Sequence, residues 1–156
     1  MTDLEEVSRL HADCGCIWRT ASAAVDEPVI MNYDGCRLVV LGLRLVIECD
    51  NCKAFDSEDS KPDLLILRQV CDGYEWLVVE IKAVMDRGAG LQVQSGIDTI
   101  STSPMFSPFS SARCIGLFAN KKANRTSNVD ALRRSLKHQG RRIPARIERC
   151  GNNKHL

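Results

Sequence analysis

The sequence predicts a single α/β domain in which a mixed central sheet is flanked by helices. The chain has 156 residues, close to the ~100–150 residues typical of one domain. Apolar residues make up 44% of it, which is ordinary for a globular protein. Segments with strand character alternate with segments of helical periodicity, and this alternation is typical of α/β folds. We place the domain at residues 1–150 and expect a disordered tail at 151–156.

The first predicted element is a short helix at residues 2–13. Thr2 can act as its N-cap, and Glu5, three residues later, is placed to complete a capping box. Residues 14–35 should be irregular, because a proline and an Asp-Gly pair within them are typical of turns.

Strand-like segments are rich in Val, Ile and Leu. The first is either one long strand or two strands broken near Gly42. The next two should pair as a β-hairpin around Asp72-Gly73, a sequence that favours tight turns. The predicted strands cover residues 37–49, 62–70, 76–84, 113–119 and 143–149.

Two more helices complete the expected order of elements. Residues 91–100 should be helical after a turn at 86–90, and residues 127–138 should form a helix that stops at the following glycine. Residues 50–61 and 101–111 are expected to be loops, the second because its two prolines disfavour a regular element.

Charge is distributed unevenly along the chain. Residues 1–80 hold seven Lys/Arg against 16 Asp/Glu, whereas residues 81–156 hold 14 against four. The basic half favours a polyanionic partner such as nucleic acid, although the two halves could instead neutralise each other across a folded interface. The residues expected to follow a nucleic-acid backbone are Lys121, Lys122, Arg125, Arg133, Arg134, Lys137, Arg141 and Arg142.

No aromatic residue interrupts this basic segment, which argues against stacking on single-stranded bases. Duplex or branched DNA is the preferred partner, with RNA as an alternative. The longest apolar stretches are shorter than the about 20 residues that span a bilayer, so no membrane association is expected. The acidic N-terminus lacks a secretory pattern, which predicts a cytoplasmic protein.

Eight cysteines raise the question of disulfides or metal. Without a secretory pattern, buried thiols or metal ligands are preferred over a disulfide framework. Cys49 and Cys52 have the CxxC spacing of a zinc knuckle, and a structural Zn²⁺ there could gain further ligands from His11, Cys14 and Cys16. The alternative is that these cysteines are simply small buried residues.

Two acids and a lysine stand in the predicted hairpin. Asp63 heads the first strand, and Glu80 and Lys82 lie in the second. Because side chains alternate along a strand, Glu80 and Lys82 share one face, and the hairpin can bring Asp63 beside them. Charges in so apolar a strand are costly unless they are paired or bind metal. The alternative is a simple Glu–Lys pair on a half-exposed face.

These residue types suit metal-dependent cleavage of a phosphodiester bond. The reaction needs a hard cation such as Mg²⁺ or Mn²⁺ to neutralise developing charge and activate water. Asp63 and Glu80 supply two carboxylates, and the backbone carbonyl of Ile81 can add a ligand. Lys82 can orient or deprotonate the water, or stabilise the phosphate in the transition state.

One set of residues resembles the PD-(D/E)XK nuclease superfamily, which includes restriction endonucleases and Holliday-junction resolvases: Pro62-Asp63, Glu80-Ile81-Lys82, and a helix with Gln92 and Gln94. The order of elements predicted over residues 2–119 matches the α-β-β-β-α-β core of that family. The resemblance implies a restriction-endonuclease-like core, here with a C-terminal α-β extension. It also implies that Asp63 and Glu80 bind metal and that Lys82 assists catalysis.

The resemblance extends the predicted site by two residues. Many members carry a glutamate in the first helix as an extra metal ligand, which implies that role for Glu5 or Glu6, and we assign it to Glu6. Both could instead be first-turn acids that suit the helix dipole. Some members carry a catalytic glutamine in the helix after the third strand. Gln92 and Gln94 lie ~200° apart around a helix, so one of them can face the site, and Gln92 is preferred.

Three hypotheses compete. The first is a Mg²⁺-dependent endodeoxyribonuclease acting in DNA repair, recombination or defence, as a homodimer or as a subunit of a larger complex, since one active site cuts one strand. The second is a catalytically inactive nuclease-fold module that binds nucleic acid or a partner protein. The third is a zinc-stabilised interaction protein. The presence of Asp63, Glu80 and Lys82 favours the first, because such charges in a strand are costly without a role.

Overall fold

The computed structural model describes residues 2–13, 15–55, 60–83, 86–121, 134–151 and 156. The elements are α1 (Asp3–Asp13), β1 (Ile17–Thr20), β2 (Pro28–Tyr33), β3 (Cys36–Leu41), β4 (Leu43–Glu48), the 3₁₀ helix η1 (Cys49–Asn51), β5 (Leu64–Val70), β6 (Gly73–Lys82), α2 (Arg87–Thr102), the 3₁₀ helices η2 (Pro104–Phe106) and η3 (Phe109–Ser111), β7 (Arg113–Asn120), β8 (Lys137–His138), β9 (Arg141–Arg142) and β10 (Ala145–Arg149).

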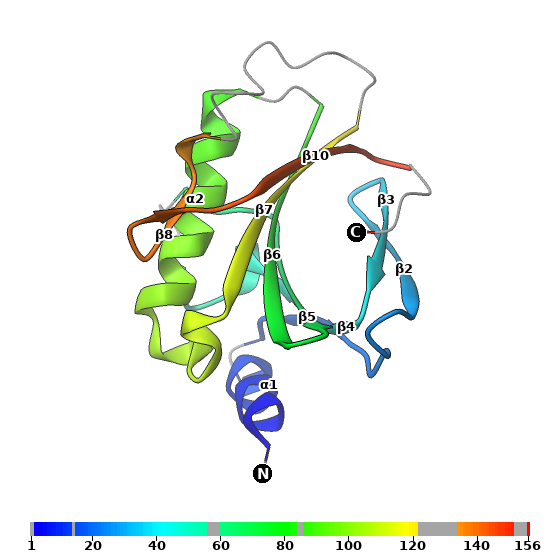
Figure 1. Cartoon of the computed structure of the whole chain (residues 1–156), viewed down its shortest axis with the longest axis vertical. Coiled ribbons are helices and arrows are strands. Elements are labelled where there is room, and N and C mark those ends of the chain that lie inside the picture. Colours follow the sequence, from blue (N-terminus) through cyan, green and yellow to red (C-terminus); the bar gives the residue numbers. More distant parts are fainter. Residues whose placement is uncertain (1, 14, 56–59, 84–85, 122–133, 152–155) are drawn as a thin grey trace.

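A six-stranded sheet with the order β1-β4-β5-β6-β7-β10 forms the centre of the molecule (Figure 1). The neighbours from β1 to β6 are antiparallel, whereas β6 pairs with β7 and β7 with β10 in parallel. The predicted α/β class with a mixed central sheet is therefore confirmed.

The two faces of the sheet have different covers. Both α1 and α2 pack on one face, where Val7 and Val93 join Trp76 in a buried cluster. The β2–β3 hairpin covers the other face, and its Met31 packs in a second cluster with Leu77 of β6. Figure 1 shows α2, the sheet and this hairpin as successive layers. The expected flanking helices therefore cover one face, and a hairpin takes the other.

The N-terminal helix forms as predicted, with its capping box. The Thr2 backbone N–H donates to Glu5 Oε2 over 2.8 Å, and the Glu5 N–H donates to Thr2 Oγ1 over 3.2 Å. These two bonds satisfy backbone donors that the first helical turn leaves without intrahelical partners. The start of α1 is thus encoded within four residues.

The prediction that residues 14–35 are irregular is wrong, because they contain β1 and β2. The predicted turn is present, with Asp34 at φ 48° and Gly35 at φ 74°, and it joins β2 to β3 as a tight hairpin. Val29, Met31 and Tyr33 face the second cluster, but the exposed Ile30 between them is also apolar, so the sequence shows little apolar alternation. Of the two alternatives for residues 37–49, the structure has the two strands broken at Gly42: β3 lies in the covering hairpin and β4 in the central sheet.

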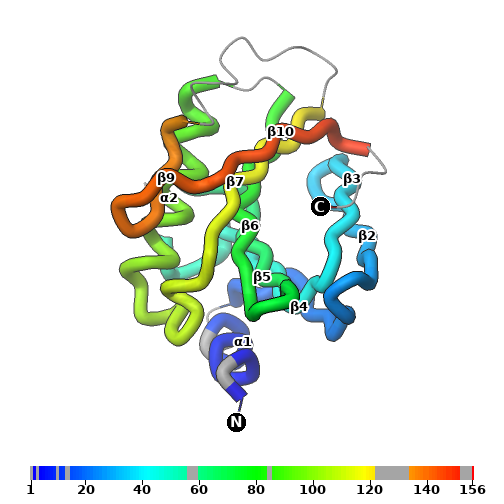
Figure 2. Tube along the Cα trace, viewed as in Figure 1, coloured from blue at the N-terminus to red at the C-terminus, as the bar shows by residue number. Residues whose placement is uncertain are grey.

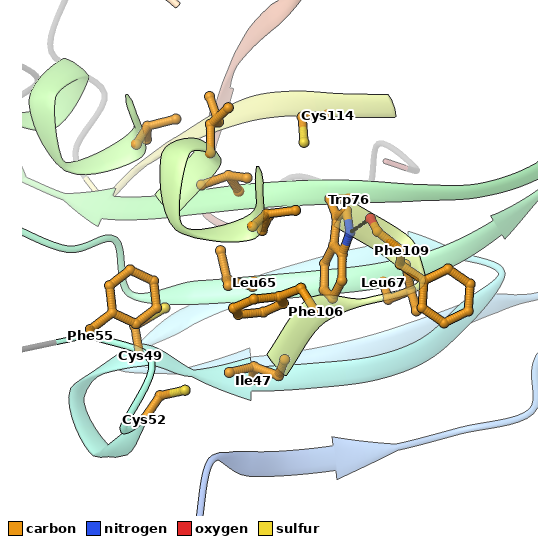
Figure 3. Close-up of a cluster of buried hydrophobic side chains, with 14 of the residues drawn as sticks. Ile47, Cys49, Cys52, Phe55, Leu65, Leu67, Trp76, Phe106, Phe109 and Cys114 are labelled. Atoms are coloured by element: carbon orange, nitrogen blue, oxygen red, sulfur yellow. Dashed lines mark hydrogen bonds between the residues drawn. The ribbon is translucent and has the colours of Figure 1, made fainter. Parts of the chain in front are cut away.

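The region after β6 differs from the prediction in detail. Asp86 was expected in a turn, but it caps α2, which begins at Arg87: the Asp86 side chain accepts from the Ala89 N–H over 3.0 Å. The expected loop at 101–111 contains η2 and η3, and the Trp76 indole donates to the Phe109 carbonyl over 3.0 Å (Figure 3).

Among the described residues, no helix combines the length and apolar character needed to cross a bilayer.

The C-terminal region departs most from the prediction. The helix expected at 127–138 lies outside the described residues as far as 133. Arg134 and Ser135 are helical as predicted, but the last two residues form strand β8. The glycine read as a helix stop belongs to a two-residue hairpin turn, with Gln139 at φ 53° and Gly140 at φ 76°. The tail expected to be disordered ends in a packed residue: Leu156 is 4% exposed and exchanges backbone hydrogen bonds with β3 (Figure 2).

The preference for thiols or metal ligands is wrong for two of the eight cysteines. Cys36 and Cys150 form a disulfide across 114 residues of sequence. Their backbones are brought together because Cys150 donates to the Asn120 carbonyl and Gly151 donates to the Arg37 carbonyl. This pairing depends on β10 lying near the start of β3, which the local sequence does not reveal.

Candidate functional site

Asp63 and Glu80 lie in one row across the sheet. Leu64 pairs with Val79, so the same register continued by one residue places Asp63 opposite Glu80. The Asp63 backbone N–H donates to the Val79 carbonyl over 3.0 Å, and its Oδ2 accepts from the Ile81 N–H over 2.7 Å. Asp63 is thereby held against β6, beside Glu80.

Glu80 is an acid buried in the sheet. It is 3% exposed, and its Oε2 has no hydrogen-bond partner among the described residues. Burial, a hydrogen bond shared with the Asp63 carboxyl and repulsion from its charge raise the pKa of Glu80 to about 9, while Lys82 opposes the shift. The two carboxyl groups therefore converge, and without a cation one proton between them is favoured.

Lys82 follows at the end of β6, on the same face as Glu80 by strand alternation. Its Nζ lies 3.5 Å from Asp86 Oδ1, at the start of α2, and its side chain is 28% exposed. The amine is thus close enough to favour the charged form of Glu80, while it remains open to solvent. The end of β6 and the first turn of α2 share this corner.

The two glutamines of α2 have separate partners, as their helical offset requires. Gln94 bonds through both amide atoms to the backbone of Lys137 in β8, over 2.8 and 2.9 Å. Gln92 donates to the Lys61 carbonyl over 3.3 Å, two residues before Asp63, and its buried Oε1 has no hydrogen-bond partner among the described residues. Gln92 is therefore the glutamine on the side of the acid pair.

The two remaining predicted ligands differ in placement. Ile81 directs its side chain into the opposite core cluster, so its backbone alone can take part in the site. Glu6 is exposed on α1, and within the described ranges it does not join Asp63 and Glu80 in a group of possible metal ligands. The structure thus brings together Asp63, Glu80 and Lys82 with Gln92 nearby, and it leaves Glu6 out.

The donor set suits a hard divalent cation. Two carboxyl groups and a backbone carbonyl are oxygen donors of the kind that Mg²⁺ accepts, with water filling the remaining positions. The Glu80 oxygen without a partner and the like charges of the acid pair are both features that a bound cation would satisfy. The residues present therefore fit Mg²⁺ or Mn²⁺.

Sequence reasoning missed a second polar group at this end of the sheet. Glu48 pairs with Leu64, beside Asp63, and its Oε2 accepts from Tyr33 Oη over 2.7 Å. Asn51 donates to the other oxygen of Glu48. Burial raises the pKa of Tyr33, and its hydrogen bond to Glu48 adds to the shift. A glutamate ending an apolar strand was the available signal, but Tyr33 lay in the segment expected to be irregular.

A cluster of soft donors lies on the helix-covered face. His11, Cys16 and Cys52 are buried, and their ligand atoms all lie within 4.8 Å of one another. Burial lowers the pKa of His11 to about 4, which keeps its ring neutral. Cys49 lies at the same end of the core cluster as Cys52 (Figure 3) but is outside this group, and Cys14 lies outside the described residues.

The predicted nucleic-acid residues fall into three groups. Lys121 follows β7, and its Nζ lies 2.8 Å from Asp34 Oδ2 in the hairpin turn. An exposed group occupies the β8–β9 hairpin and the residues just before it, beside α2 (Figure 2): Arg134, Lys137, Arg141 and Arg142. The remaining three lie outside the described residues: Lys122, Arg125 and Arg133.

Comparisons of the chain with models of known protein families, with curated proteins and with solved structures found no match. We therefore infer the function from the geometry around Asp63 and Glu80. Asp63, directly before β5, and Glu80 and Lys82 of β6 come together where β6 ends and α2 begins. Gln92 of α2 is bonded to the backbone two residues before Asp63.

Proposed function

We propose that this protein is a Mg²⁺-dependent nuclease that hydrolyses phosphodiester bonds of DNA. The observation that carries the proposal is the buried Glu80 carboxyl, which meets Asp63 and has an oxygen without a hydrogen-bond partner among the described residues. A buried pair of acids is costly unless a proton or a cation lies between them. A bound cation would remove this cost and would also supply the metal needed for phosphodiester hydrolysis.

Each residue has a defined task in this proposal. Asp63 and Glu80 hold the cation, which when bound neutralises charge on the phosphate and activates a water molecule. Lys82 lies at the solvent-open side of the pair, where its amine can orient that water and stabilise the charge of the phosphate. Gln92 can donate its amide to the water or to a phosphate oxygen.

The arrangement of elements also supports the proposal. Strands β4, β5 and β6 form an antiparallel meander, followed by α2 and by β7 parallel to β6. This is the β-β-β-α-β order implied by the resemblance to the PD-(D/E)XK nucleases, with Asp63 directly before the second strand of the meander and Glu80 in the third. A restriction-endonuclease-like fold is therefore part of the proposal. The start of α2 beside Lys82 adds a helix N-terminus, which favours phosphate.

Duplex or branched DNA is the proposed substrate. The exposed arginines of the β8–β9 hairpin provide charge for the phosphate backbone, without aromatic side chains for stacking on bases. Cleavage of both strands requires two active sites, so we propose that the chain acts as a homodimer or within a larger complex.

A cleavage assay tests the proposal. Plasmid, linear duplex and four-way-junction DNA would be incubated with the full chain in Mg²⁺, Mn²⁺ or EDTA. We expect metal-dependent cutting, reduced about 100-fold or more by Glu80→Gln and by Lys82→Ala, because each change removes a group that acts on the metal or the phosphate. Asp72→Asn is the matched control, since this exposed acid lies in the turn at the opposite end of β6.

DNA binding by the same proteins separates catalysis from affinity. Circular dichroism would establish that each variant is folded, and the two site variants should still bind the junction. Binding without cutting by the wild-type protein in either metal would overturn the nuclease proposal and favour the inactive-module hypothesis.

A further inference from the structure

We propose that His11, Cys16 and Cys52 form a structural zinc site that fastens α1 and the start of β1 to the turn beside Asp63. This proposal is independent of the nuclease chemistry, because it concerns a different set of donors. The three ligands come from three separate parts of the fold: α1, the residue before β1, and the residue after η1.

The ligand geometry is close to that of a tetrahedral zinc centre. Cys52 Sγ lies 3.9 Å from His11 Nδ1, and all three ligand atoms lie within 4.8 Å of one another. Bonds of about 2.3 Å to sulfur and about 2.0 Å to nitrogen place ligand atoms about 3.5–3.8 Å apart around zinc. The cluster therefore needs a contraction of about 1 Å or less at its longest separation to hold the ion.

The donor chemistry selects the metal. Thiolates and a neutral imidazole are soft or intermediate ligands that favour zinc over Mg²⁺, which prefers oxygen. All three residues are 3% exposed or less, so an ion held by them would be shielded from solvent. The fourth position is left to water, because Cys49 lies outside the ligand group despite its CxxC spacing to Cys52.

The surroundings of His11 fit a ligand held in one orientation. Its ring packs against Phe106 with centroids 4.8 Å apart, and the backbone of Met105 lies beside the imidazole. The His11 Nδ1 atom lies on the side of Cys52, whereas the buried Nε2 makes no hydrogen bond within the described residues. Nδ1 is therefore the nitrogen that we assign to the metal.

The cluster is linked through the backbone to the candidate active site. The Cys52 N–H donates to the Cys49 carbonyl over 3.1 Å, and the Cys49 N–H donates to the Asp63 carbonyl over 3.1 Å. Zinc bound to Cys52 would therefore order the turn that supports Asp63. The ion would stabilise the position of this acid without contacting it.

The metal content of the full-length protein is the primary test. We expect protein purified under reducing conditions, without chelator, to contain about one zinc per chain. After zinc is replaced with Co²⁺, thiolate-to-cobalt charge-transfer absorption and the d–d bands of a tetrahedral ion should appear. Wild-type protein that holds no zinc and gives no thiolate–cobalt absorption would overturn the proposal, as would a Cys16–Cys52 disulfide found by mass spectrometry under the same conditions.

Variants assign the ligands. Cys52→Ser and His11→Asn should lower the zinc content severalfold, whereas Cys114→Ser should retain it. Cys114 is the matched control, because it is buried in the same core cluster but lies outside the ligand group. Zinc retained fully by both ligand variants would overturn the assignment. If these variants fail to fold, alkylation of the wild-type protein decides: zinc should protect Cys16 and Cys52, and equal labelling with and without zinc would contradict the site.

Discussion

At the scale of single residues, Glu80 has the most informative environment. It stands in one row of the sheet between Asp63 and Phe118, with apolar residues on either side along β6. Its pKa is raised to about 9 by burial and by Asp63, so it binds a proton at neutral pH when no cation is present. A divalent cation must displace this proton, and metal affinity should therefore rise with pH.

The raised pKa predicts how metal-free stability changes with pH. Below its ordinary pKa of 4.5, Glu80 is protonated in both the folded and unfolded states. As the pH rises toward 9, the unfolded chain loses this proton and the folded protein keeps it, so the free energy of unfolding falls. Between about pH 4.5 and pH 7, this difference in protonation should lower the free energy of unfolding by roughly 3 kcal/mol.

Glu80→Gln removes this titration. The stability of the variant relative to wild type should therefore increase as the pH rises from about 4.5 to 7. Urea unfolding of both proteins in EDTA, at matched pH values, measures the difference. A difference that is independent of pH would show that Glu80 is not held protonated. Mg²⁺ should stabilise the wild type more than the variant, because the glutamine lacks the second carboxylate.

At the scale of elements, Gly42 determines which layer each strand joins. It lies between β3 and β4 at φ 72°, and it lets an apolar segment leave the hairpin layer and enter the central sheet. The Gly42 N–H donates to the Glu27 carbonyl, and its carbonyl accepts from Gln69 over 2.8 Å. A Cβ at this position would collide with the Gln69 carbonyl.

Gly42→Ala should therefore lower the free energy of unfolding by about 2–4 kcal/mol, from a left-handed backbone and a backbone clash together. Gly35→Ala is the matched control, because Gly35 also has a positive φ, of 74°, but an added Cβ would meet nothing within 4 Å. Gly35→Ala should lower the free energy of unfolding by about 1–2 kcal/mol. Equal losses measured by chemical denaturation would refute the clash at Gly42.

α2 is likewise positioned by a small residue. A Cβ at Gly96 would press on Pro62 and Val78, so the glycine allows the helix to approach β6 and the segment before β5. No feature of the local sequence explains a glycine in this helix. The sheet beneath it supplies the reason, and the close approach also places Gln92 beside Lys61.

At the scale of the whole molecule, the Cys36–Cys150 disulfide joins the covering hairpin to the end of β10. The bond joins two residues that are 114 apart in the sequence. It therefore strongly reduces the number of conformations open to the unfolded chain. Cys36→Ser should lower the free energy of unfolding by about 2–4 kcal/mol under non-reducing conditions. Cys71→Ser should have little effect, because Cys71 is exposed and outside the disulfide.

Denaturation with and without reductant completes this test. The difference between wild type and Cys36→Ser should vanish when the disulfide is reduced, apart from the effect of the serine itself. A wild-type protein whose stability is unchanged by full reduction would contradict the predicted contribution.

Local features were predictable from the sequence because their partners lie within a few residues. The Thr2–Glu5 capping box and the turn at Asp34-Gly35 are of this kind. The adjacency of Asp63 and Glu80 was also accessible, since a hairpin brings together strands that follow each other in the chain. The predicted helix end near Gly140 failed because a glycine serves equally well in a hairpin turn.

The sequence by itself determined the α/β class and the hairpin that brings Asp63 beside Glu80, the pair that we propose to bind a hard cation. Only the tertiary structure decided which face each layer covers, that Cys36 pairs with Cys150, and that His11 meets Cys16 and Cys52. The physical reason is the distance along the chain over which each interaction acts. Turns, caps and strand alternation depend on residues that are near neighbours in the sequence. Layer packing instead joins segments far apart in the chain, whose encounter is set by the burial of apolar surface from the whole molecule.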